Sequence, residues 1–167
     1  MLRELPGLKI LVLPVGVLNV AASYREGAAR DLAAMLRDAG FKGAIAGSRV
    51  YDIPYPRQPN QAWLYWKRFR GLADAVKASP PEEADYVLLM DVMASARDDG
   101  TLRRIGGIHV MVVTGGGEMT FGRLQNSLHR VFQEIDPRTM ADACHVAVEN
   151  LLAARADLSG SRKPPGP

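Results

Sequence analysis

Two short apolar runs stand out along the chain, at residues 9–15 (KILVLPV) and 84–92 (ADYVLLMDV). Both are rich in branched side chains and lack the apolar–polar alternation of a half-exposed strand. Continuous runs of this kind are typical of strands buried inside a sheet. We therefore predict a buried strand at each run, the second ending near Asp91.

Helical periodicity follows the first run. Apolar residues recur at helical spacing from Tyr24 to Leu36, and Gly40 stands where a left-handed turn would end the helix. Ser23 and Glu26 have the spacing of a capping box. Residues 41–50 alternate small and apolar side chains and predict a further strand, so this part of the chain should form a strand–helix–strand unit with a parallel strand pair.

A second helix is predicted after the proline-rich residues 51–60, within AWLYWKRFRGLADAVKAS at 62–79. Its apolar stripe comprises Ala62, Tyr65, Trp66, Phe69, Ala73 and Val76. Trp63, Lys67, Arg68 and Arg70 fall off that stripe, and we take them as candidate partner-binding residues. An aromatic helix with basic neighbours can pack on a sheet, stack on bases or lie at a membrane surface.

An antiparallel meander is predicted next, with a turn at Asp98–Gly100 and a strand at 101–114 that carries a bulge at Gly106 and Gly107. The following glycines, Gly115, Gly116 and Gly117, admit two interpretations. In the first they turn a hairpin, with Met119 and Phe121 on one face of the next strand and a short helix from about Ser127. In the second, residues 118–135 form one helix.

The helical alternative would make Gly115–Gly122 a phosphate-binding loop, because Gly117 and Gly122 have the glycine spacing of a P-loop. A P-loop also requires a lysine and then a hydroxyl after its last glycine, and here Arg123 and Leu124 follow. The glycines Gly115, Gly116, Gly117 and Gly122, with Arg123, are therefore the cofactor-binding candidates of this alternative alone. We favour the hairpin, and we expect no nucleoside triphosphate binding.

The composition and the spacing of cysteines and histidines argue against a disulfide-bonded, metal-binding or membrane-spanning protein. The 167 residues are 47% hydrophobic and 23% charged, and the net charge is +3, which suits one globular domain. The lone Cys144 rules out an intrachain disulfide and favours a core position. The three histidines show no metal-ligand spacing, although His109 can meet Asp91 or Glu118 across the sheet. No apolar run is long enough for a transmembrane segment. We predict no catalytic residues, no metal and no cofactor.

The two apolar runs, Lys9–Val15 and Ala84–Val92, resemble the opening and central strands of the TolB amino-terminal-like, CsgG-like and LpoB-like domains of bacterial cell envelopes. The resemblance implies a non-catalytic module that binds other envelope proteins or assembles with itself. It also implies the periplasm or the outer membrane if the natural start lies upstream of Met1, and the cytoplasm otherwise.

These observations predict a single α/β domain over residues 1–158, in two or three layers. It should have a mixed sheet, a parallel βαβ start, an antiparallel meander, about three helices with the last opened by Asp136 and Pro137, and a disordered tail at 159–167. The expected function is protein interaction in the bacterial envelope. Two alternatives stay open: an enzyme or sensor for a phosphorylated small molecule at Gly115–Gly122, and weak nucleic-acid binding through Trp63–Arg70, with no specific nucleic acid expected.

Overall fold

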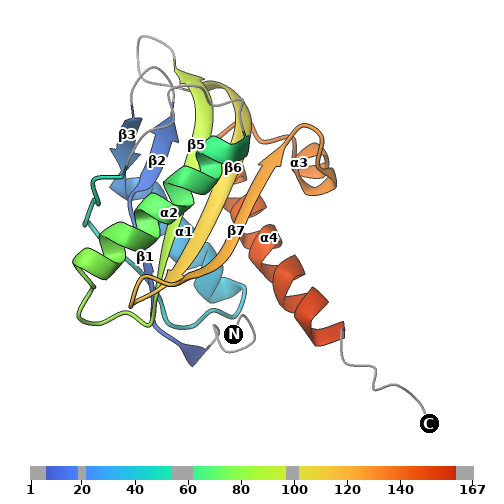
Figure 1. Ribbon diagram of the computed structural model, residues 1–167. Helices are drawn as coiled ribbons and strands as arrows, with labels where there is room; N and C mark the ends of the chain where they lie inside the picture. The colour runs from blue at the N-terminus through green and yellow to red at the C-terminus, as the bar shows by residue number, and fades with distance from the viewer. Residues whose placement is uncertain (1–6, 19–21, 54–61, 97–101, 161–167) are drawn as a thin grey trace.

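The computed structural model describes residues 7–18, 22–53, 62–96 and 102–160, and the side chains of 22, 62–64, 96, 103 and 157–160 are outside that description. The chain forms a mixed α/β fold in three layers (Figure 1). Helix α2 (Ala62–Ala78) covers one face of the sheet, and α1 (Glu26–Asp38) and α4 (Met140–Gly160) cover the other. A short helix, α3 (Arg130–Ile135), precedes α4.

The central strand is β5 (Tyr86–Ala96), which continues beyond the predicted end at Asp91. It pairs in parallel with β1 (Ile10–Val12) and β2 (Val15–Leu18), and antiparallel with β6 (Leu102–Thr114). The predicted first strand is thus divided in two. The pairing register against β5 changes by one residue between β1 and β2, across Leu13 and Pro14. Proline has no backbone N–H to donate to the neighbouring strand.

The parallel strand–helix–strand unit is confirmed, because β1 pairs in parallel with β4 (Ala44–Ala46) after α1. Strand β4 is shorter than the predicted 41–50. The predicted capping box is wrong: Ser23 lies in β3 (Ala22–Arg25), which pairs antiparallel with β2, and Arg25 precedes α1 without a side-chain cap. Ser23 is therefore used in strand pairing and is not available to cap the helix.

The hairpin at the glycines is confirmed. Strand β6 turns through Gly115–Glu118 into β7 (Met119–Asn126), and the two strands pair antiparallel. The predicted bulge in β6 is also present, since Met93 pairs with Gly107 and Ala94 with Ile105. The Asp98–Gly100 turn lies outside the described residues.

The face assigned to Met119 is wrong. Val112 pairs with Phe121 and Val113 with Met119, so Thr120 is an extra residue in β7. This bulge shifts which face of the sheet the side chains of β7 point to. Met119 packs beneath α2, whereas Phe121 packs on the side of α1 and α4.

The last helix begins later than predicted. Asp136 ends α3 in a left-handed conformation with φ 46°, and α4 starts at Met140. The cap of α4 is formed by Thr139 and Asp142, because the Thr139 hydroxyl accepts from the Asp142 N–H at 3.2 Å and the Asp142 carboxylate accepts from the Thr139 N–H at 2.8 Å.

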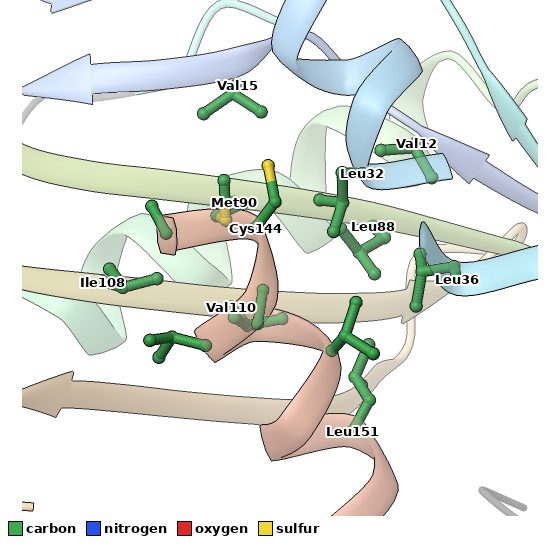
Figure 2. Packing of buried hydrophobic residues seen from close by; sticks show 14 of the residues in the cluster. Val12, Val15, Leu32, Leu36, Leu88, Met90, Ile108, Val110, Cys144 and Leu151 are labelled. Carbon is green, nitrogen blue, oxygen red and sulfur yellow. The ribbon is translucent and has the colours of Figure 1, made fainter. Parts of the chain in front are cut away.

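The larger core lies between the sheet and helices α1 and α4, where Val12, Leu88, Val110 and their neighbours meet Leu32 and Leu151 (Figure 2). Cys144 is fully buried there, with its Sγ 3.8 Å from the Ala28 carbonyl oxygen. Burial raises the pKa of this thiol to about 12, so Cys144 is a core residue, as predicted.

Gly117 offers a direct test of the hairpin. It has φ 83°, and a Cβ there would overlap the Ala73 carbonyl oxygen and lie 2.7 Å from Lys77 Cβ. Gly117→Ala should lower the free energy of unfolding by at least about 1 kcal/mol, because both the backbone conformation and the space favour glycine. Urea denaturation measures the difference.

Gly116→Ala is the matched control, since a Cβ at Gly116 meets nothing closer than Thr114 Oγ1 at 3.8 Å. It should change the free energy of unfolding by less than about 0.5 kcal/mol. Equal effects of the two substitutions would contradict the hairpin geometry.

Candidate functional site

Helix α2 is attached to the sheet by a buried ion pair. The Arg68 guanidinium binds the Asp91 carboxylate of β5 at two points: Nε donates to Oδ2, and Nη2 donates to Oδ1 at 2.9 Å. Both side chains are completely buried. Burial opposes the charged form of Arg68, but the hydrogen bond and the negative charge of Asp91 outweigh it and raise the pKa of Arg68. The guanidinium therefore stays charged inside the protein.

Three further segments complete the surroundings of this pair. Arg68 Nη1 donates to the Ile53 carbonyl oxygen at 3.2 Å, and Nη2 donates to the Tyr24 hydroxyl of β3 at 3.3 Å. Gly16 of β2 pairs with Asp91, and a Cβ at Gly16 would overlap Asp91 Oδ1. Glycine is therefore required at this position for the carboxylate to turn toward α2.

His109 lies on the other side of Asp91, as its directly opposite partner on β6. This is one of the two neighbours that the sequence predicts for His109. The ring packs edge-to-face on Tyr65 of α2, with centroids 5.4 Å apart, and Nδ1 has no hydrogen-bond partner among the described residues. Burial lowers the pKa of His109 to about 4, and the charge of Arg68 adds to this effect against that of Asp91. His109 is therefore neutral at pH 7.

The structure separates the predicted partner-binding residues. Lys67 and Arg70 are exposed on α2, whereas Arg68 is buried beneath it, and the Trp63 side chain lies outside the described set. Arg68 belongs to the buried face because it follows Tyr65 by three residues and precedes Leu72 by four, the spacing of one helix face. Helical periodicity in the sequence already allowed this position, but the charge of arginine argued for the surface.

Trp66 also lies on a different side of α2 from the one that the sequence predicts. It was expected on the buried stripe, but it is 55% exposed. Its indole contacts the ring of Phe69 edge-on, with centroids 5.8 Å apart. Phe69 in turn covers Gly122 of β7, where a Cβ would lie 2.7 Å from the Phe69 ring. Trp66 thus stands beside the β7 side of α2, near Lys67 and Arg70.

We call the outward side chains of Trp66, Lys67 and Arg70 the α2 surface. It combines a large aromatic side chain with two exposed positive charges, and such side chains commonly anchor protein interfaces. Strand β7 pairs only with β6 among the described strands, and Phe69, which contacts Trp66, covers Gly122 of β7. This arrangement can contact a partner, but it contains no pair of groups suited to acid–base chemistry.

The glycine loop has a structural explanation. Gly115 N–H donates to the Asp85 carbonyl oxygen at 2.7 Å, Gly117 N–H to the Thr114 carbonyl oxygen at 2.9 Å, and Glu118 N–H to Thr114 Oγ1 at 3.0 Å. These three donors are used inside the protein. The turn also leads into a strand, whereas a P-loop directs its phosphate to a helix N-terminus.

The remaining members of the phosphate candidate set lie away from the turn. Gly122 pairs with Met111, three residues along β6 from Thr114, at about 10 Å by strand rise. The Arg123 guanidinium lies 5.9 Å from the centre of the Phe121 ring. The structure therefore does not bring Gly115–Gly117 together with Gly122 and Arg123 into one cradle.

Within the described residues, no group of three or more histidine, cysteine, aspartate or glutamate side chains is placed to hold a metal ion. None of the described helices has both the length and the apolar character needed to cross a bilayer.

Comparison with known proteins finds no matching family model and no matching curated protein. Among solved structures, the chain is similar to PelC from Paraburkholderia phytofirmans, described as a dodecamer. The identity is 14%, the match covers 89% of this chain and 86% of that one, and the TM-score is 0.45. A single-residue variant of the same dodecamer matches at 13% identity with a TM-score of 0.42 and the same coverage. Likenesses this remote carry no argument about function.

The buried histidine predicts a pH dependence of stability. The pKa of His109 is lowered from 6.5 to about 4 in the folded protein, so the unfolded chain binds more protons between these values. The stability contributed by neutral His109 is complete above about pH 6.5 and is lost as the pH falls toward 4. We expect His109 to lower the free energy of unfolding by about 2–3 kcal/mol between pH 7 and pH 4.5.

Urea denaturation of His109→Gln at both pH values isolates this contribution, because the variant should lose less stability than the parent by about that amount. His145→Gln is the control, since the His145 side chain is 59% exposed. The prediction fails if the His109→Gln and parent proteins lose equal stability on acidification.

Proposed function

We propose that this chain is a non-catalytic protein-interaction module of the bacterial cell envelope, and that it binds its partner through the α2 surface. The observation that supports this most directly is the exposure of Trp66, 55% of whose surface is open to solvent beside Lys67 and Arg70. Burying the exposed part of this indole against a partner would be favourable, and tryptophan and arginine dominate the binding energy of many protein interfaces.

The envelope location in this proposal is supported by the resemblance of residues 9–15 and 84–92 to strands of TolB amino-terminal-like, CsgG-like and LpoB-like domains. We propose the periplasm or the outer membrane as the compartment, and other envelope proteins or further copies of the chain as partners. A basic α2 surface would favour a partner with a negative patch, because complementary charges accelerate association and orient it.

The two alternatives have different requirements. A phosphorylated ligand at Gly115–Gly122 would need free backbone donors, and three of those in the turn are already used. Nucleic-acid binding would use the same Trp66, Lys67 and Arg70, with bases stacked on the indole. It would lose affinity steeply with salt, whereas a protein partner held by a buried tryptophan would not.

Photo-crosslinking tests the proposal in the native host. A photoreactive phenylalanine analogue at position 66 should capture a discrete protein that fractionates with the envelope. The same analogue at position 30, which is exposed on α1 and so lies on the opposite face of the sheet, should not. Lys67→Glu with Arg70→Glu should reduce capture at position 66 about tenfold, because both favourable charges are reversed.

Three outcomes would contradict the proposal: equal capture from positions 66 and 30, crosslinks to nucleic acid in place of protein, or capture that is confined to cytoplasmic proteins. The last would reject the envelope location while leaving the α2 surface as an interface. The second would favour the nucleic-acid alternative.

A further inference from the structure

A second surface lies on the opposite face of the sheet from α2, where α1 and α4 pack side by side (Figure 1). Between the C-terminal part of α1 and the outer side of α4 runs a groove of about 450 Å³. It shares no residue with the α2 surface, with the Arg68–Asp91 pair or with the glycine turn. We call it the α1–α4 groove.

Helical spacing organises the lining of this groove. On α4 the lining residues Ala141, His145, Val148 and Leu152 follow one another at intervals of four, three and four. This is the a/d spacing by which one helix receives the side chains of another. Met35 of α1 and Ala39, the residue that caps the end of α1, lie four residues apart and form the facing wall.

The size of the lining residues leaves room for an incoming side chain. Ala39 and Ala141 are small, and Ala39, Met35 and Leu152 are only partly buried although they pack against the core. From Ala141 to Leu152 the stripe extends about 16 Å, or three helical turns. A short helix of about three turns therefore matches the groove in length and in the spacing of its contacts.

The charge of the groove is opposite to that of the protein. Its lining includes three carboxylates, those of Asp38, Asp142 and Glu149, and no lysine or arginine among the described residues. The whole chain has a net charge of +3. A bound helix would therefore place positive side chains along the rim.

Three arginines close in sequence to the groove residues make contacts of their own. Arg37 donates to the Ala44 carbonyl oxygen at 2.8 Å, Arg138 pairs with Asp136, and the Arg155 guanidinium lies 6.0 Å from the centre of the Phe41 ring. Asp142 is itself engaged in the cap of α4. Glu149 Oε1 lies 3.6 Å from His145 Nε2, and both side chains remain open to solvent. An incoming cation can therefore meet Asp38 and Glu149.

We propose that the α1–α4 groove binds a basic amphipathic helix of a partner protein. Apolar side chains of that helix, spaced at three and four residues, would fill the spaces between Met35 and Ala39 on one wall and Val148 and Leu152 on the other. Lysine or arginine on its flanks would pair with Asp38 and Glu149. This binding surface is separate from the α2 surface, so the chain could join two partners across its sheet.

A designed peptide tests this directly. The probe is a fluorescein-labelled peptide of about 20 residues, with leucine at the a and d positions and lysine at the flanking positions. A control peptide has glutamate in place of every lysine. Fluorescence anisotropy should show binding of the lysine peptide and at least about tenfold weaker binding of the glutamate peptide. The bound lysine peptide should become helical by circular dichroism.

Variants of the protein locate the site. Asp38→Lys with Glu149→Lys should weaken binding of the lysine peptide at least about tenfold. Ala141→Trp should weaken it by a similar factor, because the position is exposed and the indole would fill the α1–α4 groove. Asp74→Lys with Glu83→Lys, both at exposed positions outside the groove, makes a matched double charge reversal and should leave the affinity within about twofold.

Four results would overturn the proposal. These are no binding of either peptide, similar affinity for both peptides, an affinity that Asp38→Lys with Glu149→Lys leaves unchanged, or sedimentation showing a wild-type dimer that the same variant dissociates. The last would assign the groove to a second copy of the chain. None of them bears on crosslinking at position 66, so this proposal and the proposed function fail independently.

Discussion

The Arg68–Asp91 ion pair is the interaction on which the arrangement of this molecule depends most. It joins α2 to the central strand, and the same guanidinium donates to Tyr24 of β3 and to the carbonyl oxygen of Ile53. Two charges taken out of water are tolerated only when each is fully paired. The sequence around them accordingly provides Gly16, which leaves space for the carboxylate, and a neutral His109 beside it. Because Arg68 points inward, the rotation of α2 about its axis is set, and Trp66 faces outward.

Much of the fold follows from periodicity alone. The apolar runs, the amphipathic helix α1, the parallel pair and the glycine hairpin are all local patterns or their immediate consequences. The errors arise where long-range pairing prevails over local preference. Ser23 joins a strand opposite Val17 when its local context suits a helix cap. Thr120 bulges and so moves Met119 to the other face. Arg68 occupies a buried helix position because Asp91, 23 residues later, compensates its charge. A pattern of neighbouring residues cannot identify a partner that far along the chain.

The candidate surfaces were harder to predict than the fold for the same reason. Exposure of Trp66 depends on which residues of α2 face the sheet, and that choice rests on Arg68. The α1–α4 groove combines residues from two helices more than 100 positions apart in the chain, such as Met35 and Ala141. The glycines of the hairpin illustrate the opposite case. Their spacing suggested a ligand, yet Gly115 and Gly117 pack against the Ala84 and Ala73 carbonyls, so close approach of the backbone explains both.

Arg68 and Asp91 act as one unit that positions α2, and a double-mutant cycle measures the coupling between them. The free energies of unfolding of Arg68→Met, Asp91→Leu and the double variant would be compared with the parent by urea denaturation at pH 7. Each single variant leaves an unpaired buried charge and should cost about 3–5 kcal/mol, whereas the double variant removes both charges and should cost much less than the sum. We expect a coupling energy of at least about 2 kcal/mol between the two substitutions. Additive effects of the two substitutions would contradict it.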